Sequence, residues 1–226
     1  NSFPAGGTVT IDQTIVYSMN MDWTGVTNMP VLSGPADKQV WIYGSMTLVP
    51  GMQWDVNGEL HFRAFEAGKT IASAGKAFIN HVFFDGPGGA WTLLDAIHTQ
   101  KNLQHIDGAL NTNGQDVTAD FAFVSTGSPS RSLHFGSSNI YVGAGSVLCP
   151  AFGIEGTFDF DAGTSTIYLT SPSVSCGDGF NGGNQTYYNL VCEVFTNVTG
   201  NNHFHSATFI DDANIFDNNV FENLTF

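Results

Sequence analysis

The most restrictive feature of this sequence is a short repeat in its last third, with a period of about 17 residues. Segments that begin at Tyr187, Phe204 and Phe221 can be written one beneath another, with aromatic, small apolar and Asn positions in the same phase. The Gly-Asn-Asn triplet at 200–202 aligns with Asp-Asn-Asn at 217–219. A period this short cannot enclose a core of its own, so the fold must arise by stacking one repeat on the next.

Such a repeat suffices for three short strands and three bends, at about 3.3 Å per residue along a strand. Stacked coils place each strand about 4.8 Å above its equivalent and pair the backbones in parallel. We therefore predict an all-β chain folded as a right-handed parallel β-helix, with shortest coils of about 17 residues, because right-handed crossovers are the rule. We treat 1–226 as one β-helix domain or a fragment of a longer one, with less regular coils over 1–64 and regular coils over 65–226.

The repeat also predicts which residues stack on their equivalents. Inward aromatic residues would form core columns, and in-register Asn side chains can form hydrogen-bond ladders. The positions that we expect in such columns and ladders are Tyr187, Phe204, Phe221, Asn189, Asn223, Asn201 and Asn218. Gly and Asn between the strands tolerate the positive φ that tight bends require.

Short alternating apolar stretches elsewhere predict further short strands. They lie at 9–11, 40–43, 60–62, 133–135, 140–142, 158–160 and 167–169. The alternative fold is an antiparallel β-sandwich with accidental repetition, which needs hairpin turns between pairing strands. Asn57-Gly58 and Asn113-Gly114 keep a local hairpin open as an alternative.

Charge limits the partners of this chain. With 20 acidic and 6 basic residues the net charge is −14, which disfavours nucleic acid because phosphates need a basic face. The 42% hydrophobic content argues against disorder, and no apolar run approaches the roughly 20 residues of a membrane helix. No Lys or Arg follows Arg131, so we expect hydrogen-bonding Asn, Thr, Ser and Asp to replace salt bridges on the most regular coils, which lie in that stretch.

Four phrases, at 110–119, 130–140, 160–167 and 180–190, resemble β-helical segments of large secreted surface proteins and adhesins. The segments in question are of the kind exported by the type IX secretion system of gliding-type bacteria. The stretches 70–78 and 89–97 fit the same style, so the resemblance covers about 65–226 well. It implies a β-helix and an export route, and it brings no catalytic motif.

The acidic, Lys-poor composition also favours an extracellular location. The chain starts at Asn1 without Met, and Phe226 ends an apolar strand pattern, so we expect a piece of a longer protein. Three cysteines, Cys149, Cys176 and Cys192, leave one disulfide or three buried thiols open. The sequons at Asn184, Asn197 and Asn223 matter only if the source glycosylates.

Carbohydrate chemistry is the alternative, because parallel β-helices also host polysaccharide lyases and hydrolases. A lyase needs an Arg or Lys base, which the most regular coils, after Arg131, lack, and the acidic surface would repel an acidic polysaccharide. A glycosidase needs two carboxylates, for which Asp159 with Asp161 and Asp211 with Asp212 are the candidate pairs. A solvated strand face or bend explains both pairs, so we predict no catalytic residues and no enzyme.

Other side chains offer ligand groups. Tryptophans that could stack on sugars are Trp23, Trp41, Trp54 and Trp91, although scattered Trp residues are more often buried or capping. If Phe204 points inward, His203 and His205 point outward from one strand, with Asp211 or Asp212 as a third ligand. We nevertheless predict no resident metal or cofactor, with Ca²⁺ at the Asp-containing bends as the alternative.

We therefore expect a non-catalytic, extracellular structural or adhesive module of a large cell-surface or secreted protein. Its partners would be neighbouring coils or domains of the same long chain, with a surface glycan or self-association through uncapped ends as further options. The alternative function is a carbohydrate-binding or carbohydrate-cleaving β-helix that acts on a polysaccharide.

Overall fold

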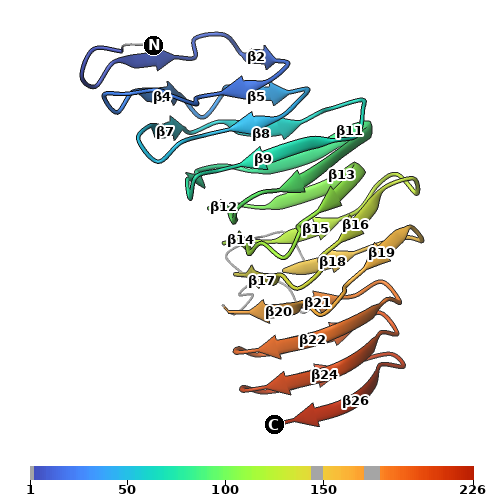
Figure 1. The fold of residues 1–226 in the computed structure, drawn as a ribbon. Helices are drawn as coiled ribbons and strands as arrows, with labels where there is room; N and C mark the ends of the chain where they lie inside the picture. The colour runs from blue at the N-terminus through green and yellow to red at the C-terminus, as the bar shows by residue number, and fades with distance from the viewer. Residues whose placement is uncertain (1–2, 144–149, 171–178) are drawn as a thin grey trace.

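The computed structural model describes residues 3–143, 150–170 and 179–226. These residues form 26 β-strands and no helix. Every strand pairing among them is parallel, and successive strands of each sheet return to the same side of the molecule. Figure 1 shows the result as a stack of short strands that runs from the N-terminal end to the C-terminal end.

Three parallel sheets carry the strands. The three-stranded sheet contains β1 (Thr8–Thr10), β4 (Val31–Gly34) and β7 (Gln53–Val56). The eight-stranded sheet contains β10 (Ala77–Phe78), β12 (Ile97–Thr99), β14 (Val117–Ala119), β17 (Asn139–Val142), β20 (Thr166–Leu169), β22 (Thr186–Cys192), β24 (His203–Phe209) and β26 (Val220–Thr225).

The third sheet has 15 strands. Its continuous path contains β2 (Ile15–Ser18), β5 (Gln39–Ile42), β8 (Glu59–Phe62), β11 (Val82–Leu93), β13 (Leu103–Asn111), β15 (Phe123–Ser125), β18 (Phe152–Ile154), β21 (Phe180–Asn181), β23 (Thr196–Thr199) and β25 (Ala213–Ile215). Off this path lie β3 (Met21–Asp22), β6 (Met46–Thr47), β9 (Lys69–Ala72), β16 (Ser132–His134) and β19 (Asp159–Asp161).

The register confirms a parallel, stacked arrangement and shows how the length of the repeat changes along the chain. At the C-terminal end Thr186 pairs with His203, and His203 with Val220, so the coils advance in 17-residue steps. Further upstream Ser132 pairs with Asp159, which is a 27-residue step. The extra residues of the longer repeats form side strands and bends, which is why the phase of the short repeat is visible only in the last third of the sequence.

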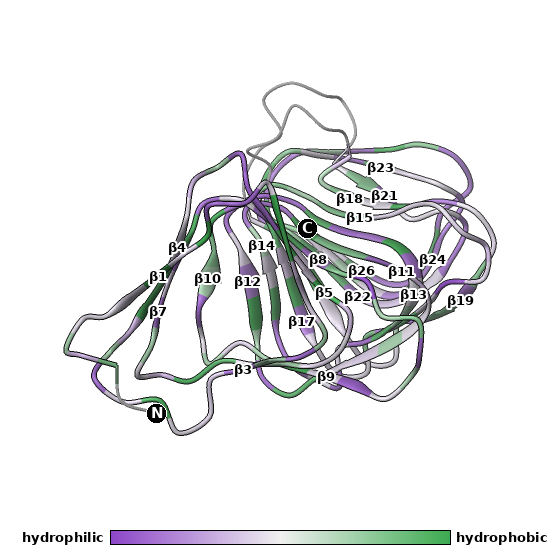
Figure 2. Cartoon of the chain, turned by 90° about the horizontal axis from the view of Figure 1, so that it is seen from above, coloured by the Kyte–Doolittle hydropathy of each residue, from purple (hydrophilic) through white to green (hydrophobic). Residues whose placement is uncertain are grey.

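A continuous apolar core runs between the sheets, from Ile11 to Phe209. Strand residues alternate between buried and outward positions, as in β17 and β20, and Figure 2 shows the matching alternation of hydropathy along the strands seen from above. Aromatic rings stack along this core: the centroids of Phe152 and Phe180 lie 4.9 Å apart with their planes inclined by 8°. Burial of each such ring contributes about 1.5–3 kcal/mol.

The bends repeat the same backbone conformation from coil to coil. Gly183, Gly200 and Asp217 occupy equivalent positions in three successive coils and have φ values of 63°, 112° and 63°. Asn184 and Asn201 follow the first two with φ values of 62° and 53°. Gly, Asn and Asp are the residues that adopt this left-handed region at the least cost, so their recurrence in the sequence reflects the geometry of the turn.

The antiparallel alternative is wrong, and its physical reason lies in strand direction. Asn57-Gly58 joins β7 to β8, but β7 pairs with β4 and β8 pairs with β5 and β11, all in parallel. Asn113-Gly114 likewise separates β13 from β14, which belong to different sheets. Both dipeptides therefore turn the chain from one sheet to the next and form no hairpin.

Candidate functional site

The predicted aromatic positions lie in one register column. Tyr187 pairs with Phe204 and Phe204 with Phe221, and their ring centroids are separated by 5.4 Å and 5.1 Å. Tyr187 is buried, and its hydroxyl donates to the Gly182 carbonyl at 2.7 Å. Burial raises the pKa of this phenol. The column is therefore an interior feature that offers no reactive group to solvent.

The predicted Asn positions are placed differently from a simple ladder. Asn189 and Asn223 share a column but are separated by Ser206, and their amides donate to Thr166 Oγ1 and the His205 carbonyl. Asn201 accepts the backbone N–H of Asn218 at 3.1 Å.

Direct Asn-to-Asn ladders fall at neighbouring positions instead. The amide of Asn202 donates to Asn219 Oδ1 at 2.9 Å, and that of Asn214 donates to Asn197 Oδ1 at 2.9 Å. Asn202 is buried, so its amide would be costly to leave unpaired. The sequence signal was present, since the members of each pair are separated by one repeat, but the alignment alone does not tell which Asn of the triplet points inward.

His203 and His205 project outward on either side of buried Phe204 and meet the same carboxylate. His203 Nε2 lies 3.4 Å from Glu222 Oε1, and His205 Nδ1 lies 2.8 Å from Glu222 Oε2. The third group is thus Glu222 of β26, whereas Asp211 and Asp212 lie in the exposed bend between β24 and β25. Within the described ranges, no group of three or more His, Cys, Asp and Glu side chains is arranged to hold a metal ion.

A hollow of about 310 Å³ opens beside these histidines. Its lining includes Asp161, Gln185, Tyr188, His205 and Glu222. The Tyr188 ring lies against the His205 ring, with centroids 4.6 Å apart and planes inclined by 23°. Asp161, a predicted candidate, and Glu222, which the sequence analysis missed, are therefore brought to one place from strands far apart in the sequence.

The other acidic candidate, Asp159, contacts the preceding coil. Its Oδ2 lies 3.2 Å from His134 Nε2 and accepts from Ser132 Oγ at 3.2 Å, while Ser132 Oγ lies 3.3 Å from the same His134 Nε2. A Ser-His-Asp triad needs the carboxylate on the ring nitrogen opposite the one that faces Ser. Both partners share one nitrogen here, so the cluster links two coils but lacks the geometry of a catalytic relay.

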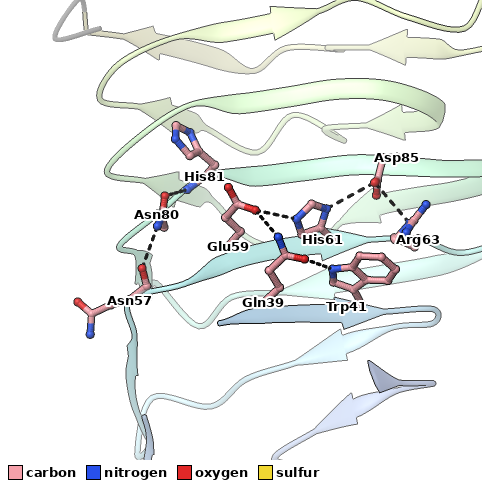
Figure 3. Close-up of polar contacts among 9 residues, drawn as sticks. All are labelled: Gln39, Trp41, Asn57, Glu59, His61, Arg63, Asn80, His81 and Asp85. Atoms are coloured by element: carbon pink, nitrogen blue, oxygen red, sulfur yellow. Dashed lines mark hydrogen bonds and ion pairs between the residues drawn. The ribbon is translucent and has the colours of Figure 1, made fainter. Parts of the chain in front are cut away.

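A second polar cluster lies on the outer face of the N-terminal coils (Figure 3). His61 Nε2 lies 3.3 Å from Glu59 Oε2, and His61 Nδ1 lies 3.4 Å from Asp85 Oδ2. Arg63 Nε is 3.4 Å from the same Asp85 oxygen, and the Arg63 guanidinium lies 4.1 Å from the centroid of Trp41. Contacts of this kind join one coil to the next, so the cluster links the neighbouring strands β5, β8 and β11 through polar side chains.

The four tryptophans differ in environment. Trp91 is buried, Trp54 packs edge-on against Phe78, and Trp23 stacks on Phe3. Trp41 lies between the rings of Tyr17 and His61, with Arg63 over its face. Trp23 also lines a hollow of about 320 Å³, together with Phe3, Asp22 and Thr24.

The interior holds a polar network that the sequence did not reveal. His105 Nε2 lies 3.0 Å from the Gly108 carbonyl, so this nitrogen carries the proton and His105 Nδ1 accepts from Ser125 Oγ at 3.1 Å. Arg131, only 1% exposed, donates to Ser125 Oγ and to the carbonyls of Ser128 and Glu155. Burial lowers the pKa of His105 to about 4. No substrate can reach the Ser125 hydroxyl, because all three side chains are buried.

The remaining expected positions are placed as follows. Cys192 is a buried free thiol, and Cys149 and Cys176 lie outside the described residues. Among the sequons Asn184 and Asn223 are exposed, whereas Asn197 is buried.

Comparisons with known proteins leave the site without an assigned role. No protein-family model, no curated protein and no solved structure matches this chain. The described part of the chain holds no helix whose length and apolar character would let it cross a membrane.

Proposed function

We propose that residues 1–226 form a right-handed parallel β-helix that serves as a non-catalytic structural or adhesive module of an extracellular protein. The observation that carries the proposal is the parallel stacking of the described strands, continuous in one sheet from β2 to β25, around one apolar core from Ile11 to Phe209. Right-handedness is the strong rule for crossovers between parallel strands. The acidic, Lys-poor composition and the resemblance to secreted surface proteins support the location.

Exposed apolar groups at the C-terminal coil support a further coil as the partner. β26 is the edge strand of its sheet, and Val220, Leu224 and Phe226 are exposed, Phe226 by 86%. A parallel strand with the same aromatic and Leu spacing would cover these side chains and pair the free backbone edge. In this role the module needs no metal or cofactor.

Pulling the chain from its two ends in single-molecule force spectroscopy tests the structural role. Coil-by-coil release of a 17-residue repeat would lengthen the chain by about 6 nm per step, at roughly 3.6 Å per residue. Smooth extension without steps would contradict stacked coils that resist load.

A parallel assay tests the absence of catalysis. Incubation with neutral and acidic polysaccharides should release neither reducing ends nor unsaturated uronate products. Release that disappears when Asp159 and Asp161 are both replaced by Asn would overturn the non-catalytic assignment. The same replacement should leave the force-extension steps unchanged, which separates the two parts of the proposal.

A further inference from the structure

The hollow beside His205 exists because the coils change length at this point. β19 pairs with β16, and the described residues place no strand on its other side. The longer step between β16 and β19 gives way to the shorter steps of β22, β24 and β26. Figure 1 shows β19 projecting at one side above the shorter coils. β19 therefore extends beyond the shorter coils that follow it, and the hollow lies between the end of β19 and those coils.

The lining of this hollow combines an aromatic surface with hydrogen-bonding groups of both kinds. Tyr188 is 36% exposed and is backed by the His205 ring. Asp161 Oδ1 accepts the Gly163 N–H at 2.8 Å, and no described residue donates to its other oxygen. Glu222 uses one oxygen for each histidine, which leaves His203 Nδ1 and His205 Nε2 for a ligand.

Charge decides which ligands suit such a lining. The hollow contains two carboxylates, Asp161 and Glu222, and no Lys or Arg occurs anywhere after Arg131. A phosphate, sulfate or uronate would therefore meet repulsion from both carboxylates, with no Lys or Arg in the lining to offset it. A purely apolar ligand would bury these polar groups without partners, which is unfavourable.

We propose that this hollow binds a short neutral oligosaccharide, with the Tyr188 ring against a sugar face and Asp161 and Glu222 accepting from its hydroxyls. A pyranose offers an apolar face and a rim of hydroxyl groups that both donate and accept, which matches the lining. The volume of about 310 Å³ is at the lower end for ligand sites, so the hollow accommodates one or two sugar units. This inference is independent of the structural role, because a β-helix that binds no sugar can still serve as a stalk.

The test is isothermal titration calorimetry after a screen of gluco-, manno-, galacto- and xylo-oligosaccharides, with oligogalacturonates and sulfated oligosaccharides as the anionic arm. We expect binding of at least one neutral series, with a dissociation constant of roughly 0.1–5 mM for so open a site. Tyr188→Ala should weaken binding about tenfold or more, while Tyr188→Phe should retain most of it. Tyr141→Ala is the matched control, because Tyr141 lies on the outer face of the same sheet, stacked on Tyr168 at 4.9 Å.

The charge argument has its own variant. Replacing both Asp161 with Asn and Glu222 with Gln should admit oligogalacturonates that the unmodified protein excludes. Absence of binding to every neutral series at 10 mM (about the weakest affinity that recognition would need) would overturn the proposal. So would equal binding by Tyr188→Ala, or a preference of the unmodified protein for the anionic arm. Melting temperatures of all variants establish that each is folded.

Discussion

Acidification should destabilise this protein through one buried side chain, His105. The folded protein holds the imidazole neutral, because burial lowers its pKa from 6.5 to about 4 and Arg131 opposes a second positive charge nearby. The unfolded chain has no such environment, so its histidine takes up a proton at about pH 6.5. Above that pH both states are neutral and the group contributes no pH dependence.

The magnitude follows from linkage. Between pH 6.5 and about 4 the unfolded state binds a proton that the folded state does not, so the free energy of unfolding falls as pH falls. Over about 2.5 pH units, at about 1.36 kcal/mol each, the loss is roughly 3 kcal/mol. This is a large part of the stability of an ordinary domain, about 5–15 kcal/mol.

The effect is measured by urea denaturation of the unmodified protein and of His105→Gln. The pH series runs from about 7.5 to about 4, which covers the range over which the unfolded histidine becomes protonated. The glutamine should lower stability at pH 7 but should remove the roughly 3 kcal/mol of extra acid sensitivity. His98→Gln is the matched control, because His98 lies on the outer face and pairs with Asp120. If His105→Gln and the unmodified protein lose stability in parallel as pH falls, the reasoning is refuted.

Three further predictions concern the stacked coils. Phe204→Ala should lower the free energy of unfolding by about 3–5 kcal/mol, because its ring is buried between the rings of Tyr187 and Phe221. The control Phe216→Ala, at a 48% exposed position, should lower it by less than about 1 kcal/mol. Equal losses in urea denaturation would contradict the aromatic column. Asn202→Ala should cost about 1–3 kcal/mol because it removes the side-chain hydrogen bonds of a buried amide to Asn219 Oδ1, the Thr199 carbonyl and the Gln185 N–H. Exposed Asn218→Ala should be nearly neutral, and thermal melts measure both effects. Burial raises the pKa of the Cys192 thiol to about 12, so the folded protein should not react with iodoacetamide at pH 8, which is about the pKa of a free thiol. Peptide mapping should find Cys192 modified only after the protein unfolds. Rapid labelling of the folded protein would contradict this burial.

The parallel stacking could be predicted because the relevant signal is repeated in the sequence. Tyr187, Phe204 and Phe221 occupy equivalent positions in three coils, and rings that stack on their own equivalents must recur at the coil period. The longer coils could not be measured in the same way. Insertions such as β16 and β19 lengthen the step between paired strands and break the phase.

Polar contacts between coils were harder to predict, because they depend on the register of neighbouring strands and on which side chain of a bend turns inward. Glu222 meets His203 and His205 only through the register of β24 with β26, and no motif marks it. An Arg is usually exposed, and nothing in the sequence around Arg131 indicates otherwise. In the structure its guanidinium is buried and donates to the carbonyl oxygens of Ser125 and Ser128. Such networks are visible only once the fold is known.

The central claim is that equivalent residues lie in one column at the spacing of parallel strands. His98, Thr118, Tyr141, Tyr168, Val191, Thr208 and Thr225 are successive partners in the eight-stranded sheet. Electron–electron double resonance can measure distances from a spin label at Thr225 to labels at Tyr168, Tyr141 and His98, introduced as non-canonical amino acids so that the native cysteines remain. The stacked fold predicts backbone separations of about 14, 19 and 29 Å, which is about 4.8 Å per strand step. Distances that do not increase linearly with the number of strands between the labels would contradict the fold.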